Sequence, residues 1–424
     1  MKVKRVVITG LGALTPIGNT CPDYWNSLLK GVSGANPITY FNTENYKTKF
    51  ACEVKNFDPN SLIDRKVARS MDRCGQYAFV TAMEAIKDSG LEIEKLNKQR
   101  IGVILGTAVG GISSVFEGVN LLHETGGIPR FSPFLLTRAL NDMISGNIAL
   151  YYGFSGTNCV TTSACASSAN ALADAFHAIQ LGKVDIVISG GAEACINQLS
   201  IGGFNSMNAL STRNDEYATA SRPFDRTRDG FVLGEGSATL IVEDYEHAKA
   251  RGAKIYAELA GVGLITDTHH ITAPHPQGEA AKLAMKMAIE DAQIEIADIG
   301  HINTHGTSTP LGDISECLAI QELFGEHAYN IAINATKSMT GHMLGAAGAA
   351  EAIATIMALH TGKIPPTINL KEKDTDIPNF NFVPNQATEH RSLAAISNSF
   401  GFGGHNASLV FSKFDQPYRF EYYC

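Results

Sequence analysis

The sequence predicts an α/β protein made of two similar halves, each with parallel strands covered by helices. The chain has 424 residues, which is too long for one small core and suggests two domains or one large duplicated unit. Short β-branched runs alternate with alanine-rich helical stretches, a pattern typical of parallel sheets. The same alternation begins again after residue 254, so we expect two domains, 1–254 and 255–424.

The first half contains three β-branched runs and two helical stretches. We predict strands over 6–9, 101–105 and 184–189, and helices over about 76–90 and 166–181. Gly10 and Gly12 follow the first run and invite comparison with a dinucleotide-binding turn. Thr15 stands where that motif has its third glycine and Pro16 follows it, so we interpret the segment as a tight structural turn.

The second half repeats this plan after a helix-like stretch at 245–252. We predict strands over 255–259, 299–303 and 393–398, and helices over 279–292 and 345–360. The helix end at 178–183 is echoed by the one at 358–363, which supports a duplication. Equivalent strand ends and helix N-termini would then meet back to back, where ligand sites in α/β proteins commonly form.

Composition and charge exclude several classes of protein. Apolar residues make up 44% and charged residues 18%, so the chain can bury a large core. The formal charge of −8 argues against sequence-independent binding to nucleic acid, and without an unbroken run of 18 apolar residues we expect no membrane insertion. The eight cysteines form no C-x-x-C pair, which favours a reducing, cytoplasmic location over a disulfide or zinc framework.

The segment from Cys159 to Asn170 is typical of a strand, a turn of small residues and a helix. This arrangement resembles a nucleophile elbow with Cys165 at its tip. A thiol at a helix N-terminus meets unpaired N–H groups, so we expect its thiolate to be favoured. The alternative is a buried structural cysteine, which is how most free cysteines occur and how we interpret Cys159 in the strand.

Two later segments place polar side chains in turns that follow predicted strands. His305 follows the strand over 299–303, on the lip of the sheet, and Lys337 and His342 lie at a glycine-packed helix start. A lone histidine is more often structural, but together with Cys165 these residues form a candidate site.

Metal binding is the alternative for the histidines. His301 and His305 are four residues apart, and His269 and His270 are adjacent. They fall on a strand or a loop without the helical H-E-x-x-H spacing of a zinc site, so we expect no metal.

The segment Asn398-Ser-Phe400-Gly-Phe402-Gly-Gly404-His-Asn406 lies between two predicted C-terminal strands. Strand propensity does not explain so many small residues. Because glycine lets backbone come close and move, we expect a mobile loop whose N–H groups and aromatic rings approach a ligand.

These blocks together resemble the β-ketoacyl-acyl carrier protein synthases, most closely those of type II, from Val6 to about Phe411. The resemblance rests on the Cys165 elbow, the segments 303–310 and 336–342, the segment 221–231 and Gly401-Phe-Gly-Gly. It implies a thiolase-like fold, in which two duplicated βαβαβ-type halves form five layers in the order αβαβα. It also implies a homodimer.

The resemblance further implies a 3-oxoacyl-[acyl-carrier-protein] synthase that elongates a fatty acyl chain by two carbons. Cys165 would hold the acyl group, with the N–H groups of Cys165 and Phe402 as its oxyanion hole. His305 and His342 would stabilise the enolate formed when malonyl-acyl carrier protein loses CO2. Lys337 would set the charge around them. Its partners would be Asp313 and Glu351, and no cofactor is implied beyond the phosphopantetheine of the carrier protein.

Three further groups of residues are assigned by the same resemblance. Phe402 would be the gate residue, supported by Phe400 and by a companion loop that holds Asp267 and His270. Val109 and Phe204 would line the acyl tunnel, although ordinary core packing is the alternative for Val109. The basic residues at helical spacing would dock the acidic carrier protein, although a solvated helix face is the usual explanation of such a stripe; they are Arg65, Lys66, Arg69 and Arg73.

The chain departs from the family pattern in three places. His405 stands where threonine is frequent, Thr304 replaces a common alanine, and the tail over 413–424 has no interpretation. Three other hypotheses stay open. They are a ketosynthase of a polyketide or aryl-polyene pathway, a non-catalytic chain-length partner in a heterodimer, and a cysteine acyl hydrolase that uses Cys165, His305 and Asp313.

Overall fold

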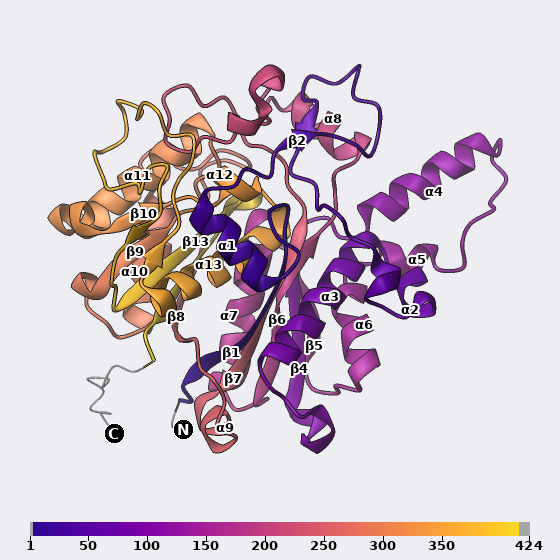
Figure 1. The fold of residues 1–424 in the computed structure, drawn as a ribbon, viewed down its shortest axis with the longest axis horizontal. Helices are drawn as coiled ribbons and strands as arrows, with labels where there is room; N and C mark the ends of the chain where they lie inside the picture. Colours follow the sequence, from indigo (N-terminus) through magenta and orange to yellow (C-terminus); the bar gives the residue numbers. More distant parts are fainter. Residues whose placement is uncertain (1–2, 415–424) are drawn as a thin grey trace.

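The structure, a computed structural model, describes residues 3–414 and is built around one mixed sheet of ten strands. Their order across the sheet is β10-β9-β13-β14-β8-β1-β7-β6-β4-β5 (Figure 1). The strands are β1 (Val6–Leu14), β4 (Ile101–Gly106), β5 (Asn158–Thr161), β6 (Ile186–Glu193), β7 (Gly236–Asp244), β8 (Ala257–Thr266), β9 (Ile299–Asn303), β10 (Ala332–Asn334), β13 (Ala394–Gly401) and β14 (His405–Ser412). Two short ribbons pair β2 (Asn36–Pro37) with β3 (Phe50–Ala51), and β11 (Lys363–Ile364) with β12 (Thr388–Glu389).

The α-helices form one outer layer on each half of the sheet and a central layer between the two halves. They are α1 (Cys21–Lys30), α2 (Arg65–Arg69), α3 (Arg73–Asp88), α4 (Ile112–Glu124), α5 (Leu135–Ala139), α6 (Met143–Tyr152), α7 (Ser167–Gln180), α8 (Gln198–Ser206), α9 (Tyr245–Ala250), α10 (Glu279–Asp291), α11 (Pro310–Phe324), α12 (Lys337–Thr340) and α13 (Ala347–Thr361). Helices α3 and α6 pack outside the first half, α10 and α11 outside the second, and α7 and α13 pack on each other in the middle. The expected five-layered thiolase-like architecture is confirmed.

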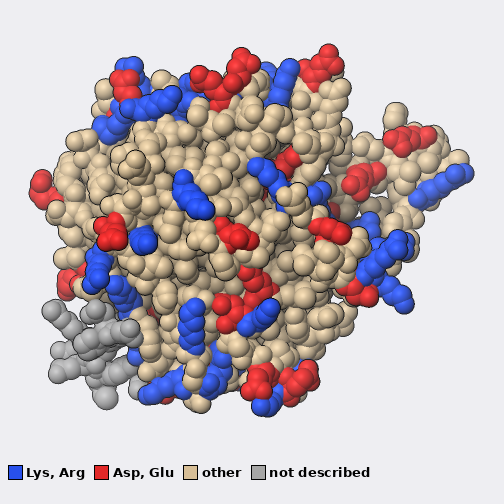
Figure 2. All heavy atoms as spheres, in the orientation of Figure 1, with Lys and Arg blue, Asp and Glu red and all other residues tan. Residues whose placement is uncertain are grey.

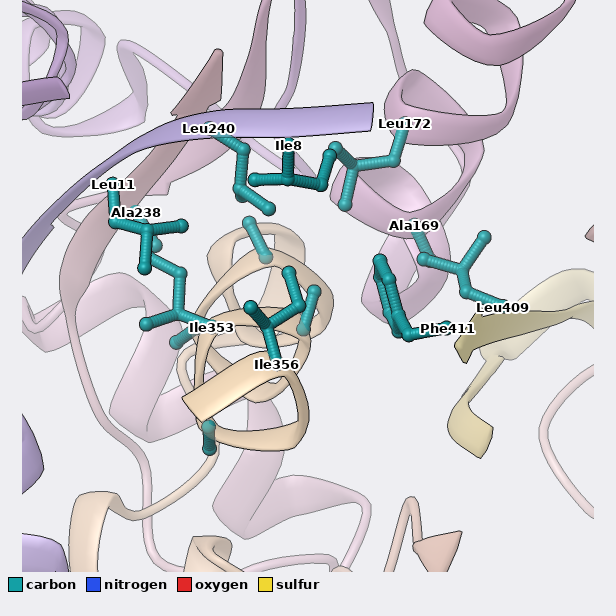
Figure 3. Close-up of a cluster of buried hydrophobic side chains, with 14 of the residues drawn as sticks. Ile8, Leu11, Ala169, Leu172, Ala238, Leu240, Ile353, Ile356, Leu409 and Phe411 are labelled. Carbon is teal, nitrogen blue, oxygen red and sulfur yellow. The ribbon is translucent and has the colours of Figure 1, made fainter. Parts of the chain in front are cut away.

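The main hydrophobic core lies around the two central helices. Figure 3 shows Ile8 of β1, Leu240 of β7 and Phe411 of β14 converging on Leu172 of α7 and Ile353 of α13. All five side chains are fully or almost fully buried. Burial of apolar surface contributed by both halves therefore holds the two halves of the sheet together.

The predicted parallel arrangement of the strands is only partly right. Strands β4, β5 and β6 are parallel to one another, as are β9, β10 and β13. The middle of the sheet is antiparallel, because β7 returns between β1 and β6 and β14 returns between β8 and β13. The halves join where Val7 and Ile8 of β1 pair with β8. Strands that are buried on both faces have continuous apolar sequences. Such a sequence does not show whether a strand runs parallel or antiparallel to its neighbours.

The predicted turn at Gly10 and Gly12 is also wrong, because both residues lie inside β1. A Cβ atom on Gly12 would lie 2.1 Å from the carbonyl oxygen of Thr81 in α3. These glycines therefore let a helix approach the strand closely, and the turn comes later, where Thr15 and Gly18 exchange backbone hydrogen bonds.

One helical stretch of the described residues, Leu344–Thr361, is long and apolar enough to cross a membrane. It contains α13, and 83% of the stretch is buried inside the protein, which is typical of a core helix. The division of the chain at residue 254 stays a prediction.

Candidate active site

Cys165 lies in a tight turn between an edge strand and a central helix. Strand β5 ends at Thr161, Ala164 has a φ of 50° in the left-handed region, and α7 begins at Ser167. The Cys165 side chain is buried, with 9% of the residue exposed. A Cβ atom on Gly401 would lie 3.1 Å from the backbone nitrogen of Cys165, so the gate segment runs directly against this turn.

Burial dominates the chemistry of the thiol. It raises the pKa of Cys165 to about 11, although the charge of Lys337 and the backbone N–H groups of Phe402 and of Cys165 itself oppose the shift. The expectation that the thiolate is favoured is therefore wrong for the unliganded site, because loss of hydration outweighs the helix N-terminus. The two N–H groups that hydrogen-bond the sulfur are those expected to form the oxyanion hole.

His305 and His342 lie side by side in the same region. His305 follows β9 and His342 follows α12, and their ring centroids are 5.3 Å apart at an interplanar angle of 85°. Burial and the nearby charge of Lys337 hold the pKa of both imidazoles well below the usual range, so both are neutral. The Lys337 ammonium donates to Nδ1 of His305 at 3.3 Å, which leaves the proton on Nε2 of that ring.

A buried ion pair stands behind the imidazoles. The Lys337 ammonium contacts the carboxylate of Glu351 in α13, and both residues are 2% exposed or less. Burial raises the pKa of Glu351 to about 7, and the charge of Lys337 opposes this change. The structure thus brings together Lys337 and its expected partner Glu351.

Asp313, the other expected partner of Lys337, faces a different residue. Its Oδ2 lies 3.1 Å from Nε of Arg228, and its carboxylate accepts hydrogen bonds from the N–H groups of Phe224 and Ser308. Asp313 therefore anchors the loop after His305 and is not the partner of Lys337. An arginine from a distant segment takes this carboxylate, and the local sequence does not reveal that.

Glu316, which the sequence analysis missed, is the carboxylate of α11 that contacts the His305 segment directly. Its carboxylate accepts the N–H groups of His305 at 2.9 Å and Gly306 at 3.0 Å, and Nδ2 of Asn398 at 3.0 Å. It lies three residues after Asp313 on α11, one helical turn further on the same face. This spacing of three residues is the sequence feature that could have identified Glu316 as a second candidate carboxylate.

The gate segment is fastened to the predicted companion loop. Asp267 donates its N–H to the carbonyl of Gly404, and Gly403 donates to the carbonyl of Ile271, each at 2.7 Å. Gly403 and Gly404 have φ values of 81° and 80°, which a residue with a side chain rarely adopts. The ring of Phe400 lies 5.8 Å from His305.

A cavity of about 830 Å³ joins these groups, and it is open to solvent. The predicted residues that line it are Cys165, His305, His342, Phe400, Phe402, Val109, Phe204, Asp267 and His270. Thus one cavity receives a thiol from the first half of the chain and two imidazoles from the second. The roles of Val109 and Phe204 in binding an acyl chain stay predictions.

The basic stripe is divided between two helices. Arg65, Lys66 and Arg69 are exposed on α2, but α3 begins at Arg73, which is half-buried. Arg73 donates to the hydroxyl of Tyr77 at 2.7 Å, so its guanidinium faces inward, and its part in docking stays a prediction. Figure 2 shows the basic side chains that gather over α2 and α5.

Cys159 is exposed, contrary to its interpretation as a buried structural cysteine. It lies on β5, at the end of the ten-stranded order, where no further strand covers that edge in the described residues. The cysteines of residues 3–414 are all unpaired.

The fold and the site together define a thiolase-like protein in which a cysteine and two histidines line one cavity. The sequence pattern described as "Beta-ketoacyl synthase, N-terminal domain" matches residues 3–248, and its C-terminal counterpart matches residues 256–371. The chain belongs to the beta-ketoacyl synthase family.

Similar proteins agree over nearly the whole chain. A "3-oxoacyl-[acyl-carrier-protein] synthase 2" from Synechocystis is 47% identical over 98% of this chain and 99% of its own length. A protein of the same description from Staphylococcus aureus is 47% identical over 97% of this chain and 99% of its own. A type II polyketide ketosynthase, solved in complex with its acyl-carrier protein, is 34% identical over 97% of this chain and 100% of its own, with a TM-score of 0.90.

We expect Lys337→Met to make Cys165 less reactive toward iodoacetamide. The ammonium favours the thiolate, so its loss raises the pKa of Cys165 further, and the alkylation rate at pH 8 should fall by about tenfold or more. The rate is measured by mass spectrometry of the Cys165 peptide, in a Cys159→Ser background that removes the exposed thiol. Lys282→Met, which removes a lysine on the outer helix α10, is the control, and an unchanged rate in Lys337→Met would contradict the prediction.

Proposed function

We propose that the protein is a 3-oxoacyl-[acyl-carrier-protein] synthase of type 2. It joins an acyl group held on Cys165 to malonyl-acyl carrier protein by decarboxylative condensation and so extends a fatty acyl chain by two carbons. One observation carries the proposal, namely the common cavity of Cys165, His305 and His342. The full-length similarity to two synthases of this description supports it.

The first step is acyl transfer to the cysteine. The sulfur of Cys165 attacks the thioester carbonyl of the acyl-carrier protein and releases the phosphopantetheine thiol, which takes up the proton of Cys165. The N–H groups of Cys165 and Phe402 already point at the sulfur, so they are close to the oxyanion as it forms. The thiol of the unliganded site is neutral. It therefore attacks only when substrate fills the cavity and an acceptor for its proton is present.

The second step is condensation. Loss of CO2 from the malonyl group leaves its electron pair in a thioester enolate, whose oxygen accepts hydrogen bonds from His305 and His342. The carbanion then attacks the acyl carbonyl, a carbon–carbon bond forms, the carbon–sulfur bond to Cys165 breaks, and the thiolate that leaves takes up a proton from solvent. Neutral imidazoles suit this role because they donate hydrogen bonds without forming an ion pair with the malonyl carboxylate.

The loops around the cavity would control access. Phe402 and Phe400 would act as the gate, with the loop of Asp267 and His270 as the surface against which the gate closes. Val109 and Phe204 would contact the acyl chain. The proposal needs no cofactor other than the phosphopantetheine on the carrier protein, because decarboxylation drives the reaction.

The rival hypotheses fare differently. The hydrolase hypothesis needs Asp313 to orient His305, but Asp313 faces Arg228 and the Nδ1 of His305 faces Lys337. A non-catalytic partner would not require Cys165 and both histidines, and this chain has all three. A polyketide ketosynthase would share the mechanism. The 47% identity to fatty-acid-type synthases against 34% to the polyketide enzyme favours the former, and turnover of saturated against polyunsaturated or aromatic primers tests it.

We also propose that carrier protein docks on α2. Its three exposed cations, Arg65, Lys66 and Arg69, form a local positive surface on a chain of formal charge −8. The side chain of Arg138 in α5 donates to the backbone oxygen of Arg69 and adds a fourth cation to this surface. The polyketide ketosynthase of similar fold is described in complex with its acyl-carrier protein.

A homodimer is supported by two features of the first half. Strand β5 is an uncovered edge of the sheet within residues 3–414, and the segment of α4 and α5 projects from the body of the molecule (Figure 1). This part of the chain exposes many large apolar side chains; they are Val115, Val119, Ile128, Phe131, Phe134, Leu136, Leu140, Leu150 and Tyr151. A second copy would cover them. A cytoplasmic location is proposed as well, in keeping with the unpaired cysteines of the described residues.

We expect variants of the site to separate the two steps. Cys165→Ala should abolish the acyl adduct, because the nucleophile is gone. His305→Ala and His342→Ala should still load acyl groups, while condensation falls by at least about 100-fold because the enolate loses a donor. Mass spectrometry of protein incubated with acyl- and malonyl-carrier proteins measures both the adduct and the 3-oxo product two carbons longer. Equal loss of loading in the histidine variants would contradict this division.

We expect charge reversal on α2 to weaken docking. The double variant Arg65→Glu, Arg69→Glu should raise the KM for carrier-bound substrate by about tenfold or more, with little change in kcat, because the cavity is untouched. Matched reversals at exposed Lys363 and Arg391, in the second half of the chain, are the control. An unchanged affinity in the α2 variant, or an equal loss in the control, would refute docking on this helix.

We expect the purified chain to sediment as a dimer of twice 45.4 kDa. Leu136→Glu and Leu150→Glu place charges at side chains that are 72% and 83% exposed in the single chain, so they should yield monomers without loss of folding. Leu311→Glu, at a residue 66% exposed on α11, is the control. A monomeric wild-type chain would refute the proposal.

A further inference from the structure

A fully buried carboxylate lies beneath the active site and belongs to none of the groups described above. Glu193 ends β6 and has no exposed surface. Burying a carboxylate without strong partners is costly, so its surroundings show what it holds. Its nearest partners come from two separate parts of the chain that both reach the cavity.

The first set of partners is the loop that follows β4. Glu193 accepts the N–H groups of Ala108 at 2.8 Å, Val109 at 3.3 Å and Gly110 at 3.1 Å, and the hydroxyl of Thr107 at 3.1 Å. Three successive backbone donors on one carboxylate fix the path of this loop. Val109 lines the cavity, so Glu193 sets the position of that part of the cavity wall.

The second partner belongs to the other half of the molecule. Oε2 of Glu193 accepts the N–H of Gly345 at 3.0 Å, in the turn that follows His342. A Cβ atom on Gly345 would lie 2.8 Å from this same oxygen and 2.3 Å from the nitrogen of Ala108, so the turn, the loop and the carboxylate are in direct contact. Glu193 is thus shared between the wall that carries Val109 and the turn that carries His342.

The charge of Glu193 also reaches the nucleophile. It is one of the causes that raise the pKa of Cys165, although burial is the larger one. Burial raises the pKa of Glu193 itself to about 6, against the effect of its backbone donors, so the group is ionised at pH 8. Glu193 therefore contacts the cavity wall and the turn that follows His342, and its charge acts on the thiol.

We propose that Glu193 is a positioning residue, which fixes the acyl-cavity wall at Val109 relative to His342 across the junction of the two halves. This inference rests on the proposed function for its effect on turnover. Replacing one carboxylate oxygen by an amide group would turn an acceptor into a donor that faces N–H groups. Oε2 accepts the N–H groups of Ala108 and Gly345, and Oε1 accepts those of Val109 and Gly110, so glutamine can satisfy only one of these two sets.

The test compares Glu193→Gln with Glu84→Gln. Glu84 of α3 is a matched control, because it is also a largely buried carboxylate that accepts two backbone N–H groups, those of Ala13 and Cys21, far from the cavity. For Glu193→Gln we expect one acyl adduct per chain, as in wild type, but a kcat for condensation about tenfold lower or more per loaded site, and a changed preference for acyl-chain length. A merely structural role would lower the number of loaded sites and leave the turnover of each loaded site unchanged.

Wild-type turnover and chain-length preference in Glu193→Gln, or the same changes in Glu84→Gln, would overturn the inference. If Glu193→Gln does not fold, Thr107→Val removes one of the donors to the carboxylate at constant size. It should change the chain-length preference in the same direction, and no change would overturn the inference as well.

A failure of the proposed function is distinguishable from a failure of this inference. If the proposed function fails, the wild-type chain forms no product that is two carbons longer than the primer. The inference about Glu193 is then tested by the alkylation rate of Cys165 in a Cys159→Ser background. Glu193→Gln removes a negative charge near the thiol, so the rate at pH 8 should rise by about threefold while that of Glu84→Gln stays unchanged. An unchanged rate in Glu193→Gln would overturn the inference.

Discussion

The two halves of the molecule approach each other through backbone contacts at glycines beneath the active site. A Cβ atom on Gly191 would lie 2.9 Å from the carbonyl oxygen of Gly345, and one on Gly345 would lie 2.3 Å from the nitrogen of Ala108. Any larger residue would push these segments apart. The contact sets the distance between the turn of Cys165 in the first half and the histidine turns of the second. Because proposed catalytic groups must act over a few ångströms, the rest of the site depends on this packing.

Burial at this junction then decides the protonation of the site. It keeps the thiol of Cys165 protonated and the two imidazoles neutral, while the ion pair of Lys337 and Glu351 lies behind the imidazoles. Fixed hydrogen-bond donors stabilise negative charge as it develops, because they are already oriented toward it.

Several site residues could be recognised from the sequence because each lies in a turn with its own local pattern. Cys165 stands among small residues between a strand and a helix, and His305 directly follows a predicted strand. The carboxylates could not be assigned in this way. Which acid on α11 reaches the site depends on how that helix is rotated and on Arg228, which arrives from a distant segment and takes Asp313, while Glu316 holds the loop of His305.

The types of the main elements, their alternation and the residues at the strand ends could all be predicted before the fold was known, because hydrophobic period and turn residues are local properties. Only the tertiary structure decided the antiparallel centre of the sheet, the exposure of Cys159 and the inward position of Arg73. It also decided the raised pKa of Cys165. Each of these depends on which distant segments pack together and on how much water they exclude, and no local pattern encodes either quantity.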